Sequence, residues 1–477
     1  MIEEILVNTG PRRRRLALVA RGRLLELLLD DRDTPRPGRL ILGRVRALAP
    51  DLDAAFVDIG EGRQGFLPAR DAPGRRGQPI GRAVQEGQAL IMQVNREAED
   101  EKGPRLSCRP RLTGRGLVLL PRGRAVVVSE RIKDAGQRRR LEVLGEGLAG
   151  QHGRGLIVRT AAAEMSDDQL GDEAERLVGR WAAIKARADA AAAPALLDAG
   201  DDGLLRALRD HLGPALSRIV VDDAALAAEM RGQCRQDLPA AEGLIGLHDE
   251  PTPLFARHDI EGQIEIALGR EVPLPSGGRL TIETTRALCA IDVDTAAADG
   301  GGDSARLWRE TNMQAAAEVA RQLRLREIGG NVVIDFIRMQ GRGDVGRLLR
   351  ALHGAFAGDR GSVRIGRMSE LGLVELSRRR RGPGLAERLG EVCPCCAGSG
   401  HRPSARAVAD NLLERIRREA AAGKGRALAV TAAVEVVADL GGPDGALLTE
   451  LAARHGCRVR LTADPELPRE SFQVSPL

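Results

Sequence analysis

Two aspartates, Asp292 and Asp335, each lie near the end of a short apolar run, and together they could support metal-dependent chemistry. The first run covers residues 290–295 and the second covers residues 331–337. Two carboxylates that face one another repel unless a cation lies between them. Oxygen ligands without a nearby thiol or imidazole favour Mg²⁺ or Mn²⁺. The pair therefore predicts a magnesium site for phosphoryl transfer, with both aspartates as catalytic residues.

A long helical pattern, residues 304–328, lies between the two runs. A strand, a helix of that length and a second strand form a βαβ unit with parallel strands and a right-handed crossover. Open α/β sheets place their active sites in a crevice at the carboxyl ends of such strands, where we expect both aspartates. The alternative is that aspartates at strand ends only start turns or cap the next helix, as Asp299 and Asp303 in the following loop would.

The composition limits the class of protein. At 477 residues the chain predicts about three domains, and 43% apolar residues suffice for packed cores. There is no apolar run of roughly 18 residues and no signal-peptide pattern at the start, so we expect a cytoplasmic protein without a membrane span. Seven mostly isolated cysteines argue against a disulfide framework. The net charge of +5 comes almost entirely from arginine, which suits phosphate-rich partners, although arginine runs are more often solvated faces.

A stretch of short alternating strands, residues 40–94, is typical of a small antiparallel barrel. It contains Phe56 and Phe66, in a chain with only six phenylalanines. Aromatic rings on the surface of such a barrel stack single-stranded bases, while cations such as Lys102 follow the backbone. The alternative is that both rings belong to the barrel core.

Several motifs resemble, in order and spacing, the ribonuclease E/G family of bacterial endoribonucleases. The resemblance covers about residues 1–410, and in length the chain is closer to the ribonuclease G members than to the ribonuclease E members. The motifs are Gly-Arg-Val at 43–45, Ala-Ala-Phe-Val-Asp-Ile-Gly at 54–60, Gly-Phe-Leu-Pro at 65–68, Gly-Leu-Ile-Val-Arg-Thr at 155–160, Pro-Leu-Phe at 253–255, Leu-Pro-Ser-Gly-Gly at 274–278, Ile-Asp-Val at 291–293, Arg-Gln-Leu-Arg-Leu-Arg at 321–326, Val-Ile-Asp-Phe-Ile at 333–337, Leu-Gly-Leu-Val-Glu at 371–375 and Cys-Pro-Cys-Cys at 393–396.

The resemblance implies a multidomain chain of mixed α+β and α/β class. The last segment matches no chemistry by itself, and we expect a small α/β packing or oligomerisation domain there. The expected parts are an RNase H-like scaffold from 1–34 and 216–285, an S1-type OB barrel at 35–118, a 5′-monophosphate sensor region at 119–215, a DNase I-like catalytic α/β unit at 286–390, a zinc link at 391–404 and the C-terminal domain at 405–477.

The resemblance also implies residue roles. Asp292 and Asp335 would hold Mg²⁺ for hydrolysis of single-stranded, A/U-rich RNA, leaving 5′-phosphate and 3′-hydroxyl ends in ribosomal or transfer RNA maturation or messenger RNA decay. The barrel would clamp the RNA, and a 5′ monophosphate would stimulate cleavage. RNA binding is assigned to Phe56, Phe66 and Lys102, and 5′-phosphate sensing to Gly114, Val118, Arg159 and Thr160.

Cys393 and Cys396 form a Cys-x-x-Cys spacing that is typical of half a zinc site. Structural zinc takes four ligands and the chain has no second such pair, so the simplest closure is the same pair from a second chain. The resemblance implies this arrangement, with one Zn²⁺ shared in a homodimer and a homotetramer left open. The alternatives are a single-chain site completed by Cys395 or His401, and a redox pair.

Two positions depart from the family pattern. Asp294 stands where the family usually has asparagine, and it becomes a further candidate Mg²⁺ ligand. Arg338 stands where some relatives carry an acidic residue. Because both catalytic aspartates are present, we expect activity, with metal dependence or rate altered by these two departures. The alternative functions are a catalytically weak RNA-binding scaffold, and an enzyme acting on DNA, against which the barrel and the sensor region argue.

Overall fold

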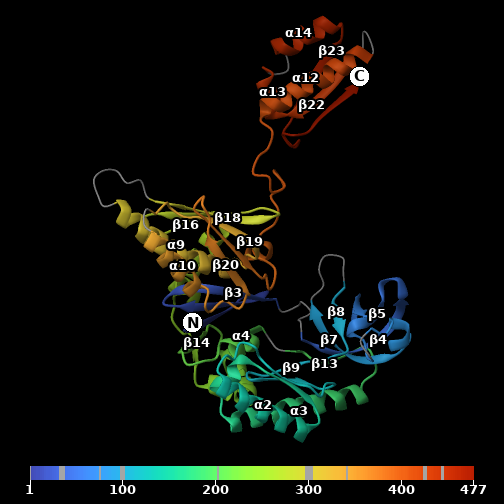
Figure 1. Cartoon of the computed structure of the whole chain (residues 1–477). Helices are drawn as coiled ribbons and strands as arrows, with labels where there is room; N and C mark the ends of the chain where they lie inside the picture. The colour runs from blue at the N-terminus through green and yellow to red at the C-terminus, as the bar shows by residue number, and fades with distance from the viewer. Residues whose placement is uncertain are drawn as a thin grey trace. The chain divides into compact units, whose positions relative to one another are not determined.

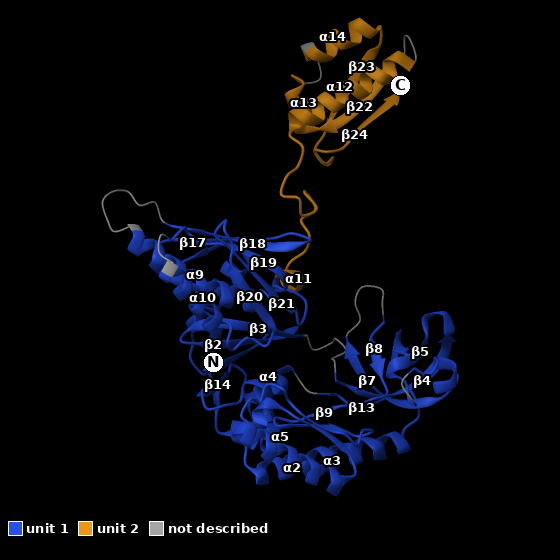
Figure 2. Cartoon of the chain, viewed as in Figure 1, with its two compact units in different colours: residues 1–385 blue, residues 386–477 orange. Residues whose placement is uncertain are grey.

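The computed structural model forms two compact units, Met1–Leu385 and Ala386–Leu477, which are described separately (Figure 2). Lys102, Asp299 and Asp303 lie outside the described residues. Within the described part of the chain, every helix is too short or too polar to span a bilayer. The structure describes residues 2–31, 38–74, 77–96, 103–200, 203–295, 304–339, 342–422, 427–441 and 445–477.

The first sheet of unit 1, here called the N-terminal sheet, joins the start of the chain to a distant segment (Figure 1). Its order is β15-β14-β1-β2-β3, with β14 parallel to β1. Strand β1 is central and buried on both faces, because Ile5 and Val7 pack in one core and Leu6 packs in another with Phe255 and Leu325. The strands are β1 (Glu4–Thr9), β2 (Arg13–Ala20), β3 (Arg23–Asp31), β14 (Arg218–Val221) and β15 (Ile245–Leu247), and helices α4 (Gly203–His211), α5 (Ala224–Asp237), α7 (Leu254–Arg257) and α8 (Ile260–Leu268) supply residues of these cores.

The predicted barrel is present. Strand β4 pairs with both β5 and β7, which closes the ring β4-β5-β6-β8-β7. Gly65 is required where the ring is narrow, since a Cβ atom there would lie 2.5 Å from Cδ1 of Leu106. A sixth strand, β13, comes from much later in the chain and pairs with β4. The strands are β4 (Leu40–Ala49), β5 (Ala54–Glu61), β6 (Arg63–Pro68), β7 (Ala89–Arg96), β8 (Arg105–Ser107) and β13 (Ala195–Asp198).

A four-stranded sheet of order β11-β12-β10-β9 packs with two helices, α2 and α3, in the region expected to sense the RNA 5′ end. Helix α3 begins at Asp167, because Ser166 and Gln169 form a capping box at its N-terminus. Its core is shared with the barrel, since Leu40 and Leu42 of β4 belong to it. The elements are β9 (Leu112–Thr113), β10 (Leu117–Leu120), β11 (Val126–Val128), α2 (Ala135–His152), β12 (Gly155–Val158) and α3 (Asp167–Ala190).

The predicted βαβ unit forms the centre of a six-stranded sheet, here called the βαβ sheet, of order β16-β17-β18-β19-β21-β20. Strands β18 and β19 are parallel, and the other pairs are antiparallel. The expected boundary between residues 285 and 286 falls inside this sheet, since β16 and β17 belong to it. The elements are β16 (Glu271–Pro273), β17 (Arg279–Thr284), β18 (Leu288–Asp294), α9 (Ser304–Leu325), β19 (Gly330–Asp335), α10 (Arg342–Ala355), β20 (Val363–Met368) and β21 (Leu373–Arg378).

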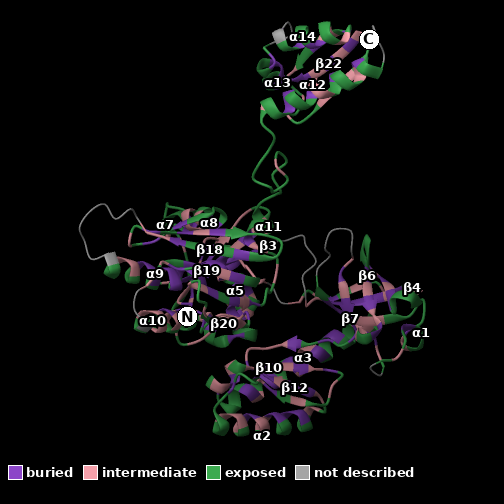
Figure 3. Ribbon diagram, turned by 45° about the horizontal axis from the view of Figure 1, so that its top comes forward, coloured by how far each residue is buried: buried purple, intermediate pink, exposed green. Residues whose placement is uncertain are grey.

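Unit 2 is a small α/β fold with a buried interior (Figure 3). Its sheet has the order β23-β22-β24, with β22 parallel to β23 and antiparallel to β24. Strand β22 ends at Ala433, and α13 begins at the next residue. The elements are α12 (Ala405–Ala422), β22 (Ala427–Ala433), α13 (Val434–Asp439), α14 (Ala446–His455), β23 (Arg458–Asp464) and β24 (Phe472–Pro476).

Candidate catalytic and RNA-binding sites

Asp292 and Asp335 are register partners on the parallel strands β18 and β19. Side chains alternate along a strand, so Ile291 and Val293 are buried beneath the helices while Asp292 faces the other side and is exposed. Asp335 is likewise exposed next to the buried Ile334. Both carboxylates therefore lie on the open face of the βαβ sheet. Asp335 is the last residue of β19, and Asp292 precedes the last residue of β18 by two positions, so both lie near the carboxyl ends of their strands, as expected.

The electrostatics of this face fit a hard cation. Partial burial raises the pKa of Asp292, and the nearby carboxylates of Asp294 and Asp335 raise it further. Such repulsion between negative groups is what a bound Mg²⁺ would relieve. Among the described residues no group of three or more acidic, histidine or cysteine side chains is close enough to hold a metal. Two carboxylates still fit Mg²⁺, because this ion commonly takes one or two protein carboxylates and completes its shell with water and substrate phosphate.

Asp294 has a cationic partner on the neighbouring strand. It is the register partner of Arg279 on β17, and Arg279 Nε donates to its carboxylate at 3.4 Å. The two strands approach closely at Gly278, where a Cβ atom would lie 2.4 Å from the Asp294 carbonyl oxygen. Arg338 is exposed just beyond the end of β19. The negative charge that Asp294 introduces, where the family usually has asparagine, is thus partly balanced by Arg279.

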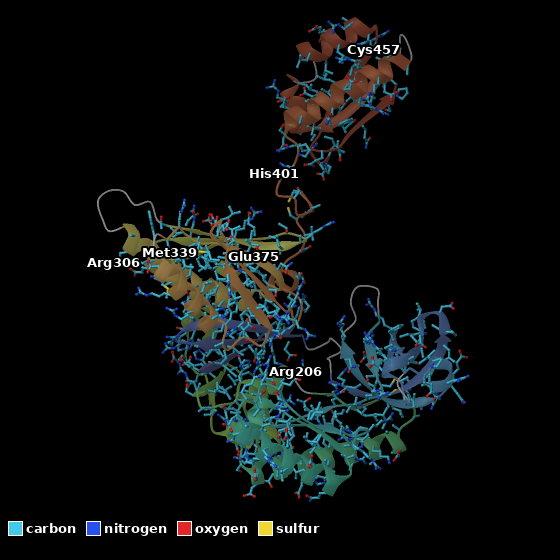
Figure 4. All side chains as sticks on the ribbon, in the orientation of Figure 1. Arg206, Arg306, Met339, Glu375, His401 and Cys457 are labelled. Atoms are coloured by element: carbon cyan, nitrogen blue, oxygen red, sulfur yellow. The ribbon has the colours of Figure 1, made fainter. Side chains whose placement is uncertain are left out.

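Two residues of this site carried no assignment from the sequence. Asn312 on α9 is fully buried, donates to the Ile337 carbonyl at 2.8 Å and accepts from the Ile337 N–H at 3.1 Å. It therefore fixes the backbone that follows Asp335. Glu375 on β21, labelled in Figure 4, is exposed and is the register partner of Val333, so it shares the open face with Asp335. In the sequence, Asn312 could have been recognised as a polar residue among the apolar positions that α9 buries.

The two barrel phenylalanines lie outside the barrel core. Phe56 and Phe66 are register partners on β5 and β6, with ring centroids 6.1 Å apart and planes at 64°. Both are half-buried, whereas the core takes their neighbours Val57 and Leu67. The alternative of two core residues is therefore wrong. Arg105 of β8 is the register partner of Phe66 and supplies a cation beside it that the sequence did not indicate.

The predicted sensor residues come together around the end of β12. Arg159 Nη1 donates to the Gly114 carbonyl at 2.7 Å, and Thr160 Oγ1 lies 3.1 Å from Oγ of Ser129. Val118 lies on β10 and pairs with Ile157, two positions before Arg159. These four residues thus belong to one end of a single sheet.

Asp210 is an unpredicted anionic member of this group. Arg159 Nη2 donates to its carboxylate at 2.7 Å, and Arg360 Nη1 approaches the second oxygen at 3.0 Å. Burial by itself would raise the pKa of Asp210. The hydrogen bond from Arg159 and the charge of Arg360 outweigh burial, so the pKa lies below its usual value. Asp210 is therefore ionised at neutral pH and joins β12 to the loop that precedes β20.

The cysteine segment forms a tight turn in unit 2. The backbone N–H groups of Cys396 and Cys395 hydrogen-bond to the Cys393 sulfur and lower its pKa, which favours the thiolate. The turn continues through Ala397 and Gly398, both with positive φ. Cys393 and Cys395 are exposed and Cys396 is half-buried. In the described part of the chain, neither Cys395 nor His401 joins the pair in a three-ligand cluster.

Comparison with known proteins agrees with this arrangement. Residues 111–381 match the family model described as the Ribonuclease E/G family, and residues 34–109 match that of the S1 RNA binding domain. Residues 392–477 match the RNase E/G, Thioredoxin-like domain, which places the cysteine turn and the C-terminal fold in one segment.

Whole-chain relatives support the same assignment. The chain is 31% identical to ribonuclease G of Salmonella typhimurium, with 99% of each protein covered. It is 33% identical to ribonuclease E of Haemophilus influenzae over 99% of this chain and 52% of that protein, and 38% identical to ribonuclease E of Nostoc over 76% and 54%. The chain thus spans about half the length of these ribonuclease E relatives. With a family model covering more than half of its residues and relatives matched along nearly its whole length, the chain belongs to the ribonuclease E/G family.

Proposed function

We propose that this protein is a Mg²⁺-dependent endoribonuclease that hydrolyses single-stranded, A/U-rich RNA and leaves 5′-phosphate and 3′-hydroxyl ends. Its place would be the cytoplasm, in ribosomal or transfer RNA maturation or messenger RNA decay. The observation that carries the proposal is the register pairing of Asp292 and Asp335 on an exposed sheet face. Relatives named ribonuclease E and ribonuclease G support the reaction class. The likeness of the N-terminal and βαβ sheets to RNase H and DNase I folds belongs to the same proposal.

Each part of the site has a role in this reaction. Asp292 and Asp335 would hold Mg²⁺, which when bound lowers the pKa of an attacking water and offsets charge on the scissile phosphate. Asn312 keeps the end of β19 in place through its two hydrogen bonds to Ile337. Because the carboxylates lie on an open face, a single-stranded backbone can approach them without entering a deep pocket.

The barrel and the sensor region would position the RNA. Phe56 and Phe66 offer an edge-to-face pair on which unpaired bases can stack, and Arg105 with Lys102 would follow the phosphates. Arg159 and Thr160, with Gly114 and Val118, would hold a 5′ monophosphate and so raise the cleavage rate by positioning.

We also propose that Zn²⁺ links two copies of the chain. Cys393 and Cys396 would donate two thiolates from each copy, which gives the four ligands that structural zinc takes. The lowered pKa of Cys393 supports thiolate ligation. The result would be a homodimer, with a homotetramer as a further assembly.

A second candidate is a catalytically weak RNA-binding scaffold. It is favoured by one observation, the Arg279–Asp294 ion pair beside the metal position, which alters the charge that the ion would meet. The scaffold predicts RNA binding without cleavage.

The deciding experiment is cleavage of a 5′-monophosphorylated, single-stranded A/U-rich RNA, with Mg²⁺ and with EDTA. Asp292→Asn and Asp335→Asn are compared with Glu283→Gln, a carboxylate on the same exposed face that pairs with Arg270. We expect internal cuts that require Mg²⁺, that are lost in both aspartate variants and that persist in Glu283→Gln. Binding without cleavage at any Mg²⁺ or Mn²⁺ concentration would leave the scaffold as the function.

A further inference from the structure

Arginines on the two sides of the βαβ sheet differ in whether a carboxylate pairs with them. On one side, Arg279 of β17 forms an ion pair with Asp294. On the other side, the edge strand β20 carries Arg364 and Arg367, which are both exposed (the strand is labelled in Figure 1). Neither forms an ion pair with any carboxylate in the part of the chain that the structure describes. We call these two residues the β20 arginines.

A bulge in β20 keeps Arg367 out of the core. The register with β21 shifts between Ile365 and Met368, so Gly366 and Arg367 both stand opposite Glu375. Ile365 and Met368 both pack against the core of the sheet. In a regular strand, Arg367 would face the same side as Ile365, because side chains alternate with a period of two. The extra residue of the bulge leaves Arg367 exposed instead.

Arg364 faces the same side of the sheet as the two aspartates. Its neighbours Val363 and Ile365 pack against the core, so its own side chain faces the open side. Its register partner is Ser377 on β21, which is in turn the register partner of Asn331 on β19. Arginine, serine and asparagine side chains are common donors to nucleic-acid phosphates. Three such side chains therefore form one row across β20, β21 and β19.

The β20 arginines lie at a short distance from the candidate metal position. Asp335 is the register partner of Leu373, which is two residues from Glu375 and four from Ser377 along β21. Strands rise about 3.3 Å per residue and lie about 4.8 Å apart, so the Arg367 backbone is about 12 Å from that of Asp335 and the Arg364 backbone about 16 Å. An extended arginine covers part of this distance. The β20 arginines can therefore reach phosphates next to the one at the metal.

The charges of the open face favour the β20 side for an RNA strand. The centre of this face is negative, because Asp292, Asp335 and Glu375 are exposed there, and it repels a phosphate backbone wherever no cation lies. On the β17 side, the guanidinium of Arg279 already has a carboxylate partner. The β20 arginines have none among the described residues, and guanidinium groups bind phosphate oxygens bidentately.

We propose that Arg364 and Arg367 bind backbone phosphates of the RNA on one side of the cleaved bond, so that the strand leaves the active centre across β21 and β20. This inference rests on the proposed function, since it assumes that RNA is the substrate. It makes the β20 arginines positioning residues, which hold the strand without contacting the reacting phosphate.

The test measures the dissociation constant of a 5′-monophosphorylated single-stranded RNA with one cleavage site, in EDTA and at several salt concentrations. Arg364→Ala and Arg367→Ala are compared with Arg270→Ala, an exposed arginine that pairs with Glu283 on the β17 side of the same sheet. Each β20 variant should bind about fivefold more weakly. Each should also lower the slope of log K against log salt by about 0.7, whereas Arg270→Ala should change neither quantity.

Two further measurements separate a phosphate contact from a structural role. Arg364→Lys and Arg367→Lys keep the charge, so they should retain the salt slope and recover part of the affinity. Replacing RNA phosphates one at a time by neutral methylphosphonates should identify a position that weakens binding to the unchanged protein but has no further effect on Arg367→Ala. In cleavage assays, the alanine variants should raise KM more than they lower kcat.

Three results would overturn the proposal in distinguishable ways. RNA binding and cleavage by Arg364→Ala and Arg367→Ala that equal those of the unchanged protein would reject the β20 contact and leave the proposed function standing. No binding of RNA by the unchanged protein would reject both. Self-association of the two alanine variants, with RNA affinity unaffected, would mean that the arginines protect the edge strand from pairing with another molecule.

Discussion

The guanidinium of Arg159 donates a 2.7 Å hydrogen bond to the carboxylate of Asp210, so the arginine predicted to bind a phosphate already has an anionic partner. Both side chains are partly exposed, at 29% and 23%. An incoming 5′ phosphate must therefore compete with Asp210 or share Arg159 with it. Under the proposed function, the preference for a 5′ monophosphate would depend on this carboxylate as well as on the arginine.

Replacing Asp210 by asparagine should strengthen the response to a 5′ monophosphate. The Asp210→Asn side chain keeps an oxygen that can accept from Arg159 but removes the competing charge. For a partly exposed pair the gain is about 1 kcal/mol at most, or roughly fivefold in the ratio of kcat/KM for 5′-phosphate over 5′-hydroxyl RNA. Arg159→Gln should lower the same ratio. A decrease in Asp210→Asn would mean that the carboxylate orients Arg159 rather than competing for it.

The stability of unit 1 should fall as the pH drops below neutrality, because of His211. Burial lowers the pKa of His211 to about 3, with help from the charge of Arg360, although the Asp210 carboxylate opposes the shift and Glu26 lies 4.0 Å away. The unfolded chain therefore binds a proton below pH 6.5 that the folded chain does not bind until about pH 3. By pH 5 this costs about 2 kcal/mol of unfolding free energy. Urea unfolding at pH 7 and pH 5 should show the loss in the unchanged protein and a smaller loss in His211→Gln.

Asn312 should affect catalysis only by holding the backbone next to Asp335 in position. Asn312→Ala leaves the buried N–H and carbonyl of Ile337 without their partner, which should lower the free energy of unfolding by about 2 kcal/mol. It should reduce kcat while the KM for RNA changes little, because the substitution displaces Asp335 but not the RNA-binding barrel. Met313→Ala, an exposed neighbour on the same helix, is the control. An unchanged kcat in a folded Asn312→Ala variant would exclude the positioning role.

Asp294 should contribute little to metal binding despite its position. Its carboxylate already has a cationic partner, since Arg279 on β17 forms an ion pair with it. The Mg²⁺ concentration for half-maximal cleavage should therefore shift by less than about threefold in Asp294→Asn, since an exposed pair contributes about 1 kcal/mol or less. Titration of activity with Mg²⁺ checks this. A shift of tenfold or more would make Asp294 a metal ligand.

The cysteine turn should control the number of chains in the assembly. Cys393→Ser and Cys396→Ser should each lose zinc and dissociate the protein to monomers, because each substitution leaves only two of the four proposed thiolates. Cys395→Ser should keep both properties. Zinc content per chain and mass from sedimentation measure the outcome. Loss of zinc in Cys395→Ser with a monomeric unchanged protein would instead support a single-chain site.

The sequence predicted local features better than their surroundings. The two apolar runs that carry Asp292 and Asp335, with a long helical pattern between them, predicted the parallel pair, and the strands of the barrel were recognisable from their spacing. The open face was not predictable, since it depends on which neighbours flank the pair and on the helices α9 and α10 covering one side only.

Sequence patterns did not predict ion pairs between residues that lie far apart in the chain. Asp210 is separated from Arg159 by 51 positions and from Arg360 by 150, and no periodicity connects them. The exposure of Phe56 and Phe66 likewise depends on which face of the closed ring each residue occupies, which the strand register fixes.

The pairing of β13 with β4 fixes the distance between the barrel and the end of β12. β13 follows α3 in the chain, yet it is hydrogen-bonded to the barrel, and Leu40 and Leu197 pack in one core with α3. The barrel and the end of β12 therefore cannot separate without breaking a β-ladder and opening that core. Under the proposed function, an RNA that engages both must span a fixed distance, and this distance would set the shortest strand whose cleavage a 5′ monophosphate can stimulate.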